Sequence, residues 1–151
     1  MLCKLILTVC LFTAAACIDP LGTESAEGLV VRAGTSFGMC IGYCQTELSI
    51  TADEIVYTES SREPGQYPTR TRRMAITPAE WADISSLGQP SDFDGLEEVY
   101  GCPDCADGGA EWIEVEQDGT RRRVTFEYGA SIGRIQRLID RIRELRAQFP
   151  R

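Results

Sequence analysis

The chain has 151 residues and a formal net charge of -8, and its charged (25%) and hydrophobic (43%) fractions are ordinary for a globular protein. An acidic surface repels phosphate groups, which excludes nucleic acid as an expected partner. The sequence contains no histidine, so Ser-His and Cys-His nucleophile pairs and histidine metal ligands are also excluded. We therefore expect a protein that is not an enzyme and that holds no cofactor.

The first sixteen residues have the order of an export signal. Lys4 supplies a positive charge, residues 5–13 are apolar, and residues 14–16 are three alanines. The apolar segment is too short to cross a bilayer as a stable helix. We predict that residues 1–16 form a signal peptide and that the protein is exported.

Cys17 directly follows these alanines, and small residues before a cysteine resemble the bacterial lipobox, in which the thiol is acylated. Ala14 stands where the usual lipobox has leucine. Residues 17–28 are mostly polar and show no periodicity, so they fit a flexible tether. We predict a lipoprotein of the cell envelope that is anchored in the bilayer through Cys17. Cleavage after Ala16 without a lipid, which would give a soluble secreted protein, is the alternative.

Residues 29–151 are expected to form a single small domain, in which alternating apolar residues indicate β-strands. The predicted strands lie at residues 29–32, 46–51, 54–59, 69–76, 110–117 and 121–128. Ala52 and Asp53 fit a tight turn between the second and third strands. Asp118-Gly119 is the strongest hairpin signal, because a type I′ turn requires a positive φ at both of its central residues.

Two helices are predicted in the same domain. Thr77 and Glu80 have the spacing of a capping box, with Pro78 at the first helical position. Ser131 is expected to cap a long final helix. Apolar residues recur in that helix at helical spacing: Ile132, Ile135, Leu138, Ile139, Ile142 and Leu145. The predicted fold class is α+β, with a mostly antiparallel sheet built from β-hairpins and two helices packed on one face.

Four cysteines remain in the predicted mature domain after Cys17. They are Cys40, Cys44, Cys102 and Cys105. An even number in an exported chain indicates two disulfides. Each local pair would restrict the unfolded chain by only about 2 kcal/mol, whereas a crossed bridge would contribute roughly 4 kcal/mol. The glycine-rich surroundings can bend tightly, and on that ground we slightly favour the local pairs, Cys40 with Cys44 and Cys102 with Cys105.

The same four cysteines allow a thiol-based function as an alternative. Two close pairs could supply a four-thiolate zinc site, although the pairs are far apart in the sequence and an oxidising compartment works against it. The second pair could also act as a redox dithiol. A reactive thiolate needs a helix N-terminus, and Gly108 and Gly109 do not favour a helix there. Asp104 and Asp107 would raise the pKa of a nearby thiol rather than lower it.

The segment GMCIGYC at residues 38–44 and the strand pair after it resemble the bacterial domain of unknown function 6438 family. The matching residues continue at Leu48, Ser49, Ile50, Val56 and Tyr57. The signature of that family is C-F-G-x-C-P followed by a β-hairpin with a D-G turn. This chain departs from the signature at Ile41, Gln45 and Glu54, which replace Phe, Pro and the turn Gly.

The resemblance extends over most of the chain from Val30 to Phe149. It implies a small α+β domain of a kind often found on exported proteins and lipoproteins, and it implies no activity, because none is assigned to the family. The pair Cys102 and Cys105 lies outside the signature.

These observations predict a non-catalytic module of the cell envelope, which is either structural or binds a protein or glycan partner. A more specific version is an inhibitor of a secreted hydrolase that presents a disulfide-held loop. Besides this partner, the predicted contact is the lipid bilayer, through the acylated cysteine.

Overall fold

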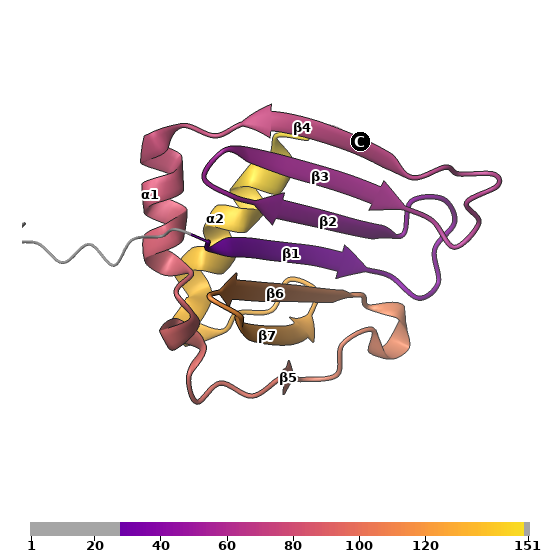
Figure 1. The fold of residues 1–151 in the computed structure, drawn as a ribbon. Coiled ribbons are helices and arrows are strands. Elements are labelled where there is room, and N and C mark those ends of the chain that lie inside the picture. The colour runs from indigo at the N-terminus through magenta and orange to yellow at the C-terminus, as the bar shows by residue number, and fades with distance from the viewer. Residues whose placement is uncertain (1–27, 150–151) are drawn as a thin grey trace, which may run out of the picture.

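The computed structural model describes residues 28–149, and within them a seven-stranded sheet carries two α-helices (Figure 1). The predicted signal peptide at residues 1–16, the predicted lipidation at Cys17 and almost all of the tether lie outside the described residues. No helix within residues 28–149 is both long enough and apolar enough to cross a membrane.

The sheet has the strand order β4-β3-β2-β1-β6-β7-β5. The strands are β1 (Val30–Ser36), β2 (Gln45–Ile50), β3 (Glu54–Ser60), β4 (Arg70–Ala75), β5 (Val99–Tyr100), β6 (Ala110–Gln117) and β7 (Thr120–Glu127). Neighbouring strands are antiparallel, except that the two-residue β5 runs parallel to β7. The α+β class and the antiparallel hairpins are confirmed, while β5 was not predicted, because two residues show no periodicity.

Both predicted tight turns are present. The backbone N–H of Thr51 donates to the carbonyl of Glu54 at 3.1 Å, which closes the hairpin of β2 and β3. Asp118 and Gly119 have φ values of 49° and 77°, the left-handed conformation that a type I′ turn requires. These local signals therefore determine the two hairpins.

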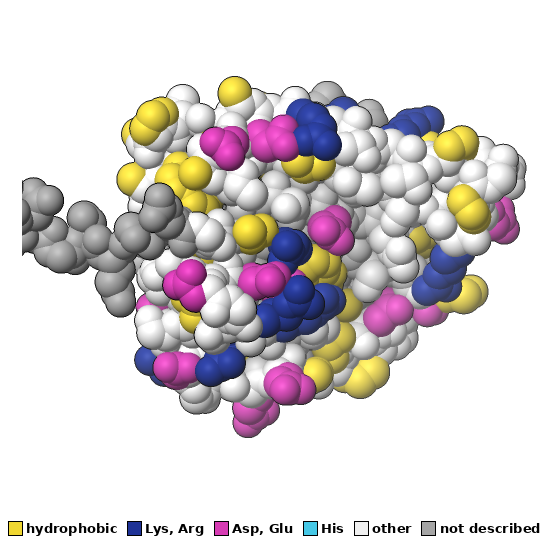
Figure 2. Space-filling model, viewed as in Figure 1, with side chains coloured by type: hydrophobic (Ala, Val, Ile, Leu, Met, Phe, Trp, Pro, Cys, Tyr) yellow, Lys and Arg dark blue, Asp and Glu magenta, His cyan; other side chains and the backbone are white. Residues whose placement is uncertain are grey.

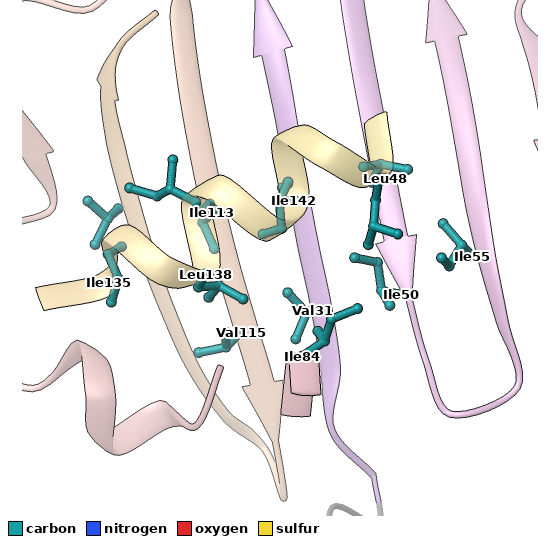
Figure 3. Packing of buried hydrophobic residues seen from close by; sticks show 14 of the residues in the cluster. Val31, Leu48, Ile50, Ile55, Ile84, Ile113, Val115, Ile135, Leu138 and Ile142 are labelled. Carbon is teal, nitrogen blue, oxygen red and sulfur yellow. The ribbon is translucent and has the colours of Figure 1, made fainter. Parts of the chain in front are cut away.

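The helices are α1 (Pro78–Leu87) and α2 (Gln136–Ala147), with short 3₁₀ turns at η1 (Pro90–Phe93), η2 (Cys105–Asp107) and η3 (Gly133–Ile135). Apolar side chains from both helices and from one face of the sheet form a single core (Figure 3). Leu138 and Ile142 of α2 pack there with Ile84 of α1 against Val31 and Leu48. Burying each such side chain stabilises the fold by about 1.5–3 kcal/mol.

The opposite face of the sheet carries ion pairs between neighbouring strands. Glu116 accepts hydrogen bonds from Arg32 at 2.8 Å and from Arg121 at 3.0 Å, and these bonds hold the pKa of its carboxyl below its usual range. Glu114 pairs with Arg32 at 3.3 Å and with Arg123 at 3.7 Å. Acidic and basic side chains also lie interspersed over the surface seen in Figure 2. Many of the arginines thus have carboxylate partners on this acidic chain.

The capping box of α1 is confirmed. The Thr77 hydroxyl accepts from the backbone N–H of Glu80 at 3.2 Å, and the Glu80 carboxylate accepts from the backbone N–H of Thr77 at 3.0 Å. Together with Pro78 this arrangement fixes where the helix begins.

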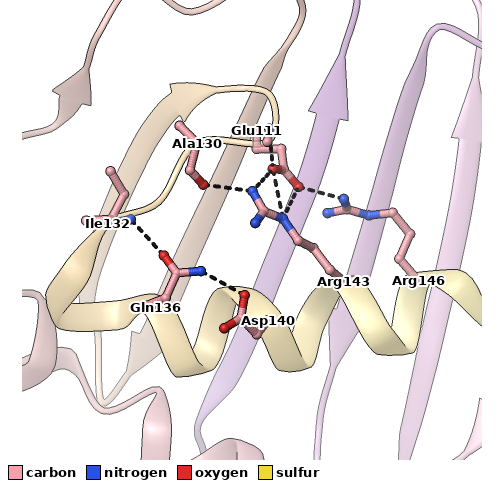
Figure 4. Close-up of polar contacts among 8 residues, drawn as sticks. Glu111, Ala130, Ile132, Gln136, Asp140, Arg143 and Arg146 are labelled. Carbon is pink, nitrogen blue, oxygen red and sulfur yellow. Dashed lines mark hydrogen bonds and ion pairs between the residues drawn. The ribbon is translucent and has the colours of Figure 1, made fainter.

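The predicted cap at Ser131 was wrong. The 3₁₀ turn η3 comes first, and α2 begins only at Gln136. No side chain caps α2 at its first residue, and the side-chain oxygen of Gln136 instead reaches back to accept from the backbone N–H of Ile132, before the 3₁₀ turn, at 3.0 Å (Figure 4). The helical spacing of Ile132 and Ile135 extends through the 3₁₀ turn because both side chains are buried, which is why the pattern suggested a longer helix.

Replacing Thr77 with Ala should lower the free energy of unfolding by about 1 kcal/mol, because an N–H of the first helical turn loses its acceptor. The matched change Ser131→Ala should have an effect within about 0.5 kcal/mol, because that serine does not cap α2. Urea denaturation of both variants measures the difference. A larger loss for Ser131→Ala than for Thr77→Ala would contradict this description of the helix ends.

Candidate functional site

Two cysteine-containing loops lie at the same end of the sheet. The first cysteine loop (residues 37–44) joins β1 to β2, and the second cysteine loop (residues 101–109) precedes β6. Ser36 pairs with Ala110, so β1 ends where β6 begins and the two loops are neighbours. Each loop holds its own cysteine pair at disulfide distance, with Cα–Cα separations of 5.6 Å for Cys40–Cys44 and 5.4 Å for Cys102–Cys105. The structure therefore has the local pairs that the sequence slightly favoured.

Asp104 connects the two loops. Its Oδ1 accepts from the backbone N–H of Gly38 at 3.0 Å and from that of Gly109 at 3.2 Å. A Cβ at Gly38 would lie 2.6 Å from Asp104 Oδ2, so a side chain there would require the Asp104 carboxylate to move. The carboxylate that we considered for its effect on a thiol instead holds the first loop against the second.

The tip of the first cysteine loop exposes two large apolar side chains. Ile41 is 90% exposed and Met39 is 79% exposed, whereas Cys44 at the base of the loop is buried. The base is held from outside, because Arg62 donates to the carbonyl of Gly38 at 2.6 Å and the Tyr43 hydroxyl donates to that of Pro68 at 2.9 Å. The loop is thus fixed at its base and apolar at its tip.

The arrangement of the cysteines gives no support to thiol chemistry. Within residues 28–149, no three or more Cys, Asp or Glu side chains form a group that could hold a metal ion. Cys102 and Cys105 are exposed, but only the three-residue turn η2 follows, and Ala106 inside it has a positive φ of 51°. A turn of this size offers no helix N-terminus to stabilise a thiolate.

Four polar side chains form a row across the sheet at this same end, on the face that carries the helices. Glu59 of β3 pairs in register with Thr46 of β2, Thr46 with Thr35 of β1, and Thr35 with Glu111 of β6. We call these four residues the polar row. The Thr35 and Thr46 hydroxyls are hydrogen-bonded at 2.7 Å, and both glutamates are buried. The apolar series that faces the core on each strand therefore ends in a polar residue.

A groove covers the polar row beside the C-terminal end of α2. Two adjoining cavities of about 580 and 520 Å³ form it, and both are lined by Thr35, Phe37, Thr46 and Tyr57. The first lobe extends to Glu111 and α2, and the second lobe extends to the first cysteine loop. Each cavity taken singly is within the size range of small-molecule sites, which is roughly 300–1,000 Å³.

Aromatic rings form the walls of the groove. The rings of Tyr57 and Phe149 stack with centroids 4.8 Å apart and an interplanar angle of 17°. Phe37 and Tyr128 lie 5.0 Å apart on the side of β6. In the second lobe the guanidinium of Arg70 lies 4.3 Å from the ring centroid of Tyr43.

Glu111 is the centre of the charged part of the first lobe (Figure 4). Its carboxylate accepts from Arg143 Nε at 3.1 Å and from Arg143 Nη2, from Arg146 Nη1 at 2.8 Å, and from the backbone N–H of Gly129 at 3.0 Å. Burial opposes its ionisation, but the hydrogen bonds from Arg143 and Arg146 outweigh burial and hold the pKa of Glu111 below its usual range. Arg143 also donates to the carbonyl of Ala130 at 2.9 Å, which ties α2 to the segment after β7.

The sequence interpretation did not identify the polar row or its arginines. A signal was present, since Glu111 occupies an inward position of its strand in step with Ile113 and Val115. Arg143 and Arg146 are spaced by one helical turn, but they looked like part of a solvated helix face.

Neither a scan against models of protein families nor a search of curated proteins found a match to this chain. The resemblance to the domain of unknown function 6438 family therefore stays a prediction.

Replacing Glu111 with Gln should lower the free energy of unfolding by about 2–4 kcal/mol at neutral pH, because it removes a buried charge from between two arginines. The folded-state pKa of Glu111 lies below the unfolded value, so its contribution is present above the unfolded pKa and is lost as the pH falls through the folded pKa. The stability gap between wild type and variant should thus shrink in acid.

Urea titrations at several pH values would measure this gap. Glu47→Gln, at an exposed position of β2, is the matched control and should change the unfolding free energy little at any pH. A gap that stays constant down to strongly acidic pH would contradict the assigned role of the Glu111 charge.

Proposed function

We propose that this chain is a non-catalytic binding module of the bacterial cell envelope, which holds a protein partner at the first cysteine loop. The supporting observation is the exposure of Ile41 and Met39 at the tip of a loop in which a disulfide joins Cys40, which lies between them, to the buried Cys44 at the base. Adjacent exposed aliphatic side chains offer no hydrogen bonds to sugar hydroxyls, so they favour a protein partner over a glycan.

The position of the loop in the domain supports the same proposal. The chain reaches β1 at Val30, next to α1, and the first cysteine loop follows at the far end of that strand (Figure 1). A strand of seven residues is about 23 Å long. With a lipid on Cys17, the loop would lie at the end of the domain opposite to the point where the tether enters it, where a partner can reach it.

The rigidity of the loop matters for affinity. A loop already held by the Cys40–Cys44 pair and by Asp104 loses little conformational freedom when it binds. A rigid loop with an apolar tip is also suited to filling the cleft of an enzyme, which keeps an inhibitor of a secreted hydrolase as one version of this function.

Replacing Cys17 with Ser in the full-length protein should move it from the membrane fraction to the soluble fraction of its host, because acyl chains then have no site of attachment. Cys10→Ser, within the predicted signal peptide, is the control and should leave the protein in the membrane fraction. Intact mass should show added acyl mass on the wild-type protein and none on the Cys17→Ser variant. A wild-type protein that is soluble and begins after Ala16 without added mass would contradict the anchor, but not the binding role.

The binding role is tested by placing a photo-crosslinking amino acid at Met39 in the envelope of the source bacterium. We expect one adduct of defined mass, which an excess of the purified wild-type domain suppresses. The competitor carrying Ile41→Asp should be at least about tenfold weaker, because a charge replaces an apolar contact at the centre of the interface.

Val99→Asp is the matched control, since Val99 is also an exposed apolar residue, at 52%, but lies on β5. It should compete like the wild-type domain. Equal competition by the Ile41→Asp domain, with circular dichroism showing that both variants are folded, would refute the proposed interface.

A further inference from the structure

We propose that the groove over the polar row is a second binding site, which takes a small ligand bearing one carboxylate group beside an aromatic or apolar body. This inference goes beyond the proposed function, because it concerns the face covered by α2 rather than the exposed loop tip. It rests on the charges, the hydrogen-bond donors and the walls of the groove.

The first lobe is positive although the whole chain is acidic. The charged side chains in its lining are those of Glu111, Arg143 and Arg146, so two guanidinium groups face one carboxylate. The formal charge of the chain is -8. A concave site of the opposite sign concentrates anions in the lobe and repels cations from it.

Arg146 has donor capacity that the fold does not use. One of its nitrogens donates to Glu111 at 2.8 Å, while its Nε is buried and has no hydrogen-bond partner among the described residues. A buried donor without an acceptor lowers stability. Because the Nε is buried, a carboxylate that enters the first lobe reaches this guanidinium only through its terminal N–H groups, with which it can form a charge-assisted hydrogen bond.

The aromatic walls of the groove indicate the chemistry of the part of the ligand that lies beyond its carboxylate. Tyr57 with Phe149 and Phe37 with Tyr128 offer aromatic faces within the first lobe, and the Thr35 and Thr46 hydroxyls lie between them. Ring faces of this kind pack well against another ring or an aliphatic chain.

The second lobe also contains charged side chains. Its ionisable residues include Glu59 and Arg70, one charge of each sign. Glu59 is paired with Arg72 of β4 at 2.9 Å. This pairing compensates the charge of Glu59 and leaves Arg70, which lies over the Tyr43 ring, as the cation of the second lobe. The position of the chemical-shift changes distinguishes binding beside Arg70 from binding beside Arg146.

The test is a titration of the protein with 3-phenylpropionate, followed by isothermal calorimetry and by amide chemical shifts. The neutral analogue 3-phenylpropionamide should bind at least about tenfold more weakly, because it cannot form charge-assisted hydrogen bonds. The shifts should centre on Thr35, Thr46 and the last turn of α2. Equal binding of acid and amide, or no saturable shift of these residues, would overturn the proposal.

Variants of α2 make the test specific. Arg146→Gln should weaken binding of the acid at least about tenfold, and Arg146→Lys should retain most of it, because the charge is kept. Arg137→Gln is the matched control, since Arg137 is an exposed arginine on the same helix outside the groove, and it should bind as wild type does. An equal loss in the Arg137 and Arg146 variants would refute the site, and the comparison of acid with amide on the wild-type protein holds even if a variant fails to fold.

Two further measurements separate this site from the loop and identify the source of the carboxylate. Ile41→Asp should leave 3-phenylpropionate binding unchanged, and a loss of binding in this variant would mean that the groove is not an independent site.

The tripeptide Gly-Gly-Phe is compared with its C-terminal amide to identify the source of the carboxylate. Tighter binding of the peptide acid than of 3-phenylpropionate assigns the site to a peptide C-terminus, and the reverse order assigns it to a free organic acid.

Discussion

The pairing of β1 with β6 is the constraint on which the rest of the structure depends. It joins the strands before α1 to those after it, and it places Arg32 opposite Glu114, 82 residues away. The same register ends with Ser36 beside Ala110, which brings the cysteine loops together, and it sets Thr35 next to Glu111, which completes the polar row. Closing so long a loop costs entropy, so these contacts form only when the apolar faces of both halves are buried together.

Much of the fold follows from local signals. The Asp118-Gly119 turn, the capping box at Thr77 and the alternating strands identify their elements, because each depends on neighbours a few residues apart. The start of α2 was wrong for the converse reason, since the Gln136 side chain and the buried η3 turn, rather than the nearest hydroxyl, decide where the helix begins. No pattern among neighbouring residues indicated that β1 pairs with β6.

The candidate sites differ in the same way. Both cysteine pairs were evident from spacing, and each local pair encloses a residue with a positive φ, Gly42 in the first loop and Asp104 in the second. The groove was not predicted, because its residues come from five strands, one helix and the connecting loops, and a row across a sheet exists only once the register is fixed. Inward glutamates at the ends of apolar series were the available sign, and their buried charges require the arginines that the helix and β4 supply.

The contact between Asp104 and Gly38 has a consequence for how such a protein can change over time. A side chain at position 38 would displace the Asp104 carboxylate from its hydrogen bonds to Gly38 and Gly109, so a change at either position disturbs the contact between the two loops. Substitutions at the tip of the loop, for instance at Ile41, cause no such disturbance, because Ile41 is 90% exposed. The first cysteine loop thus combines a constrained base with a tip whose residues can change. Such a loop would let one domain acquire new partners while the domain keeps its fold.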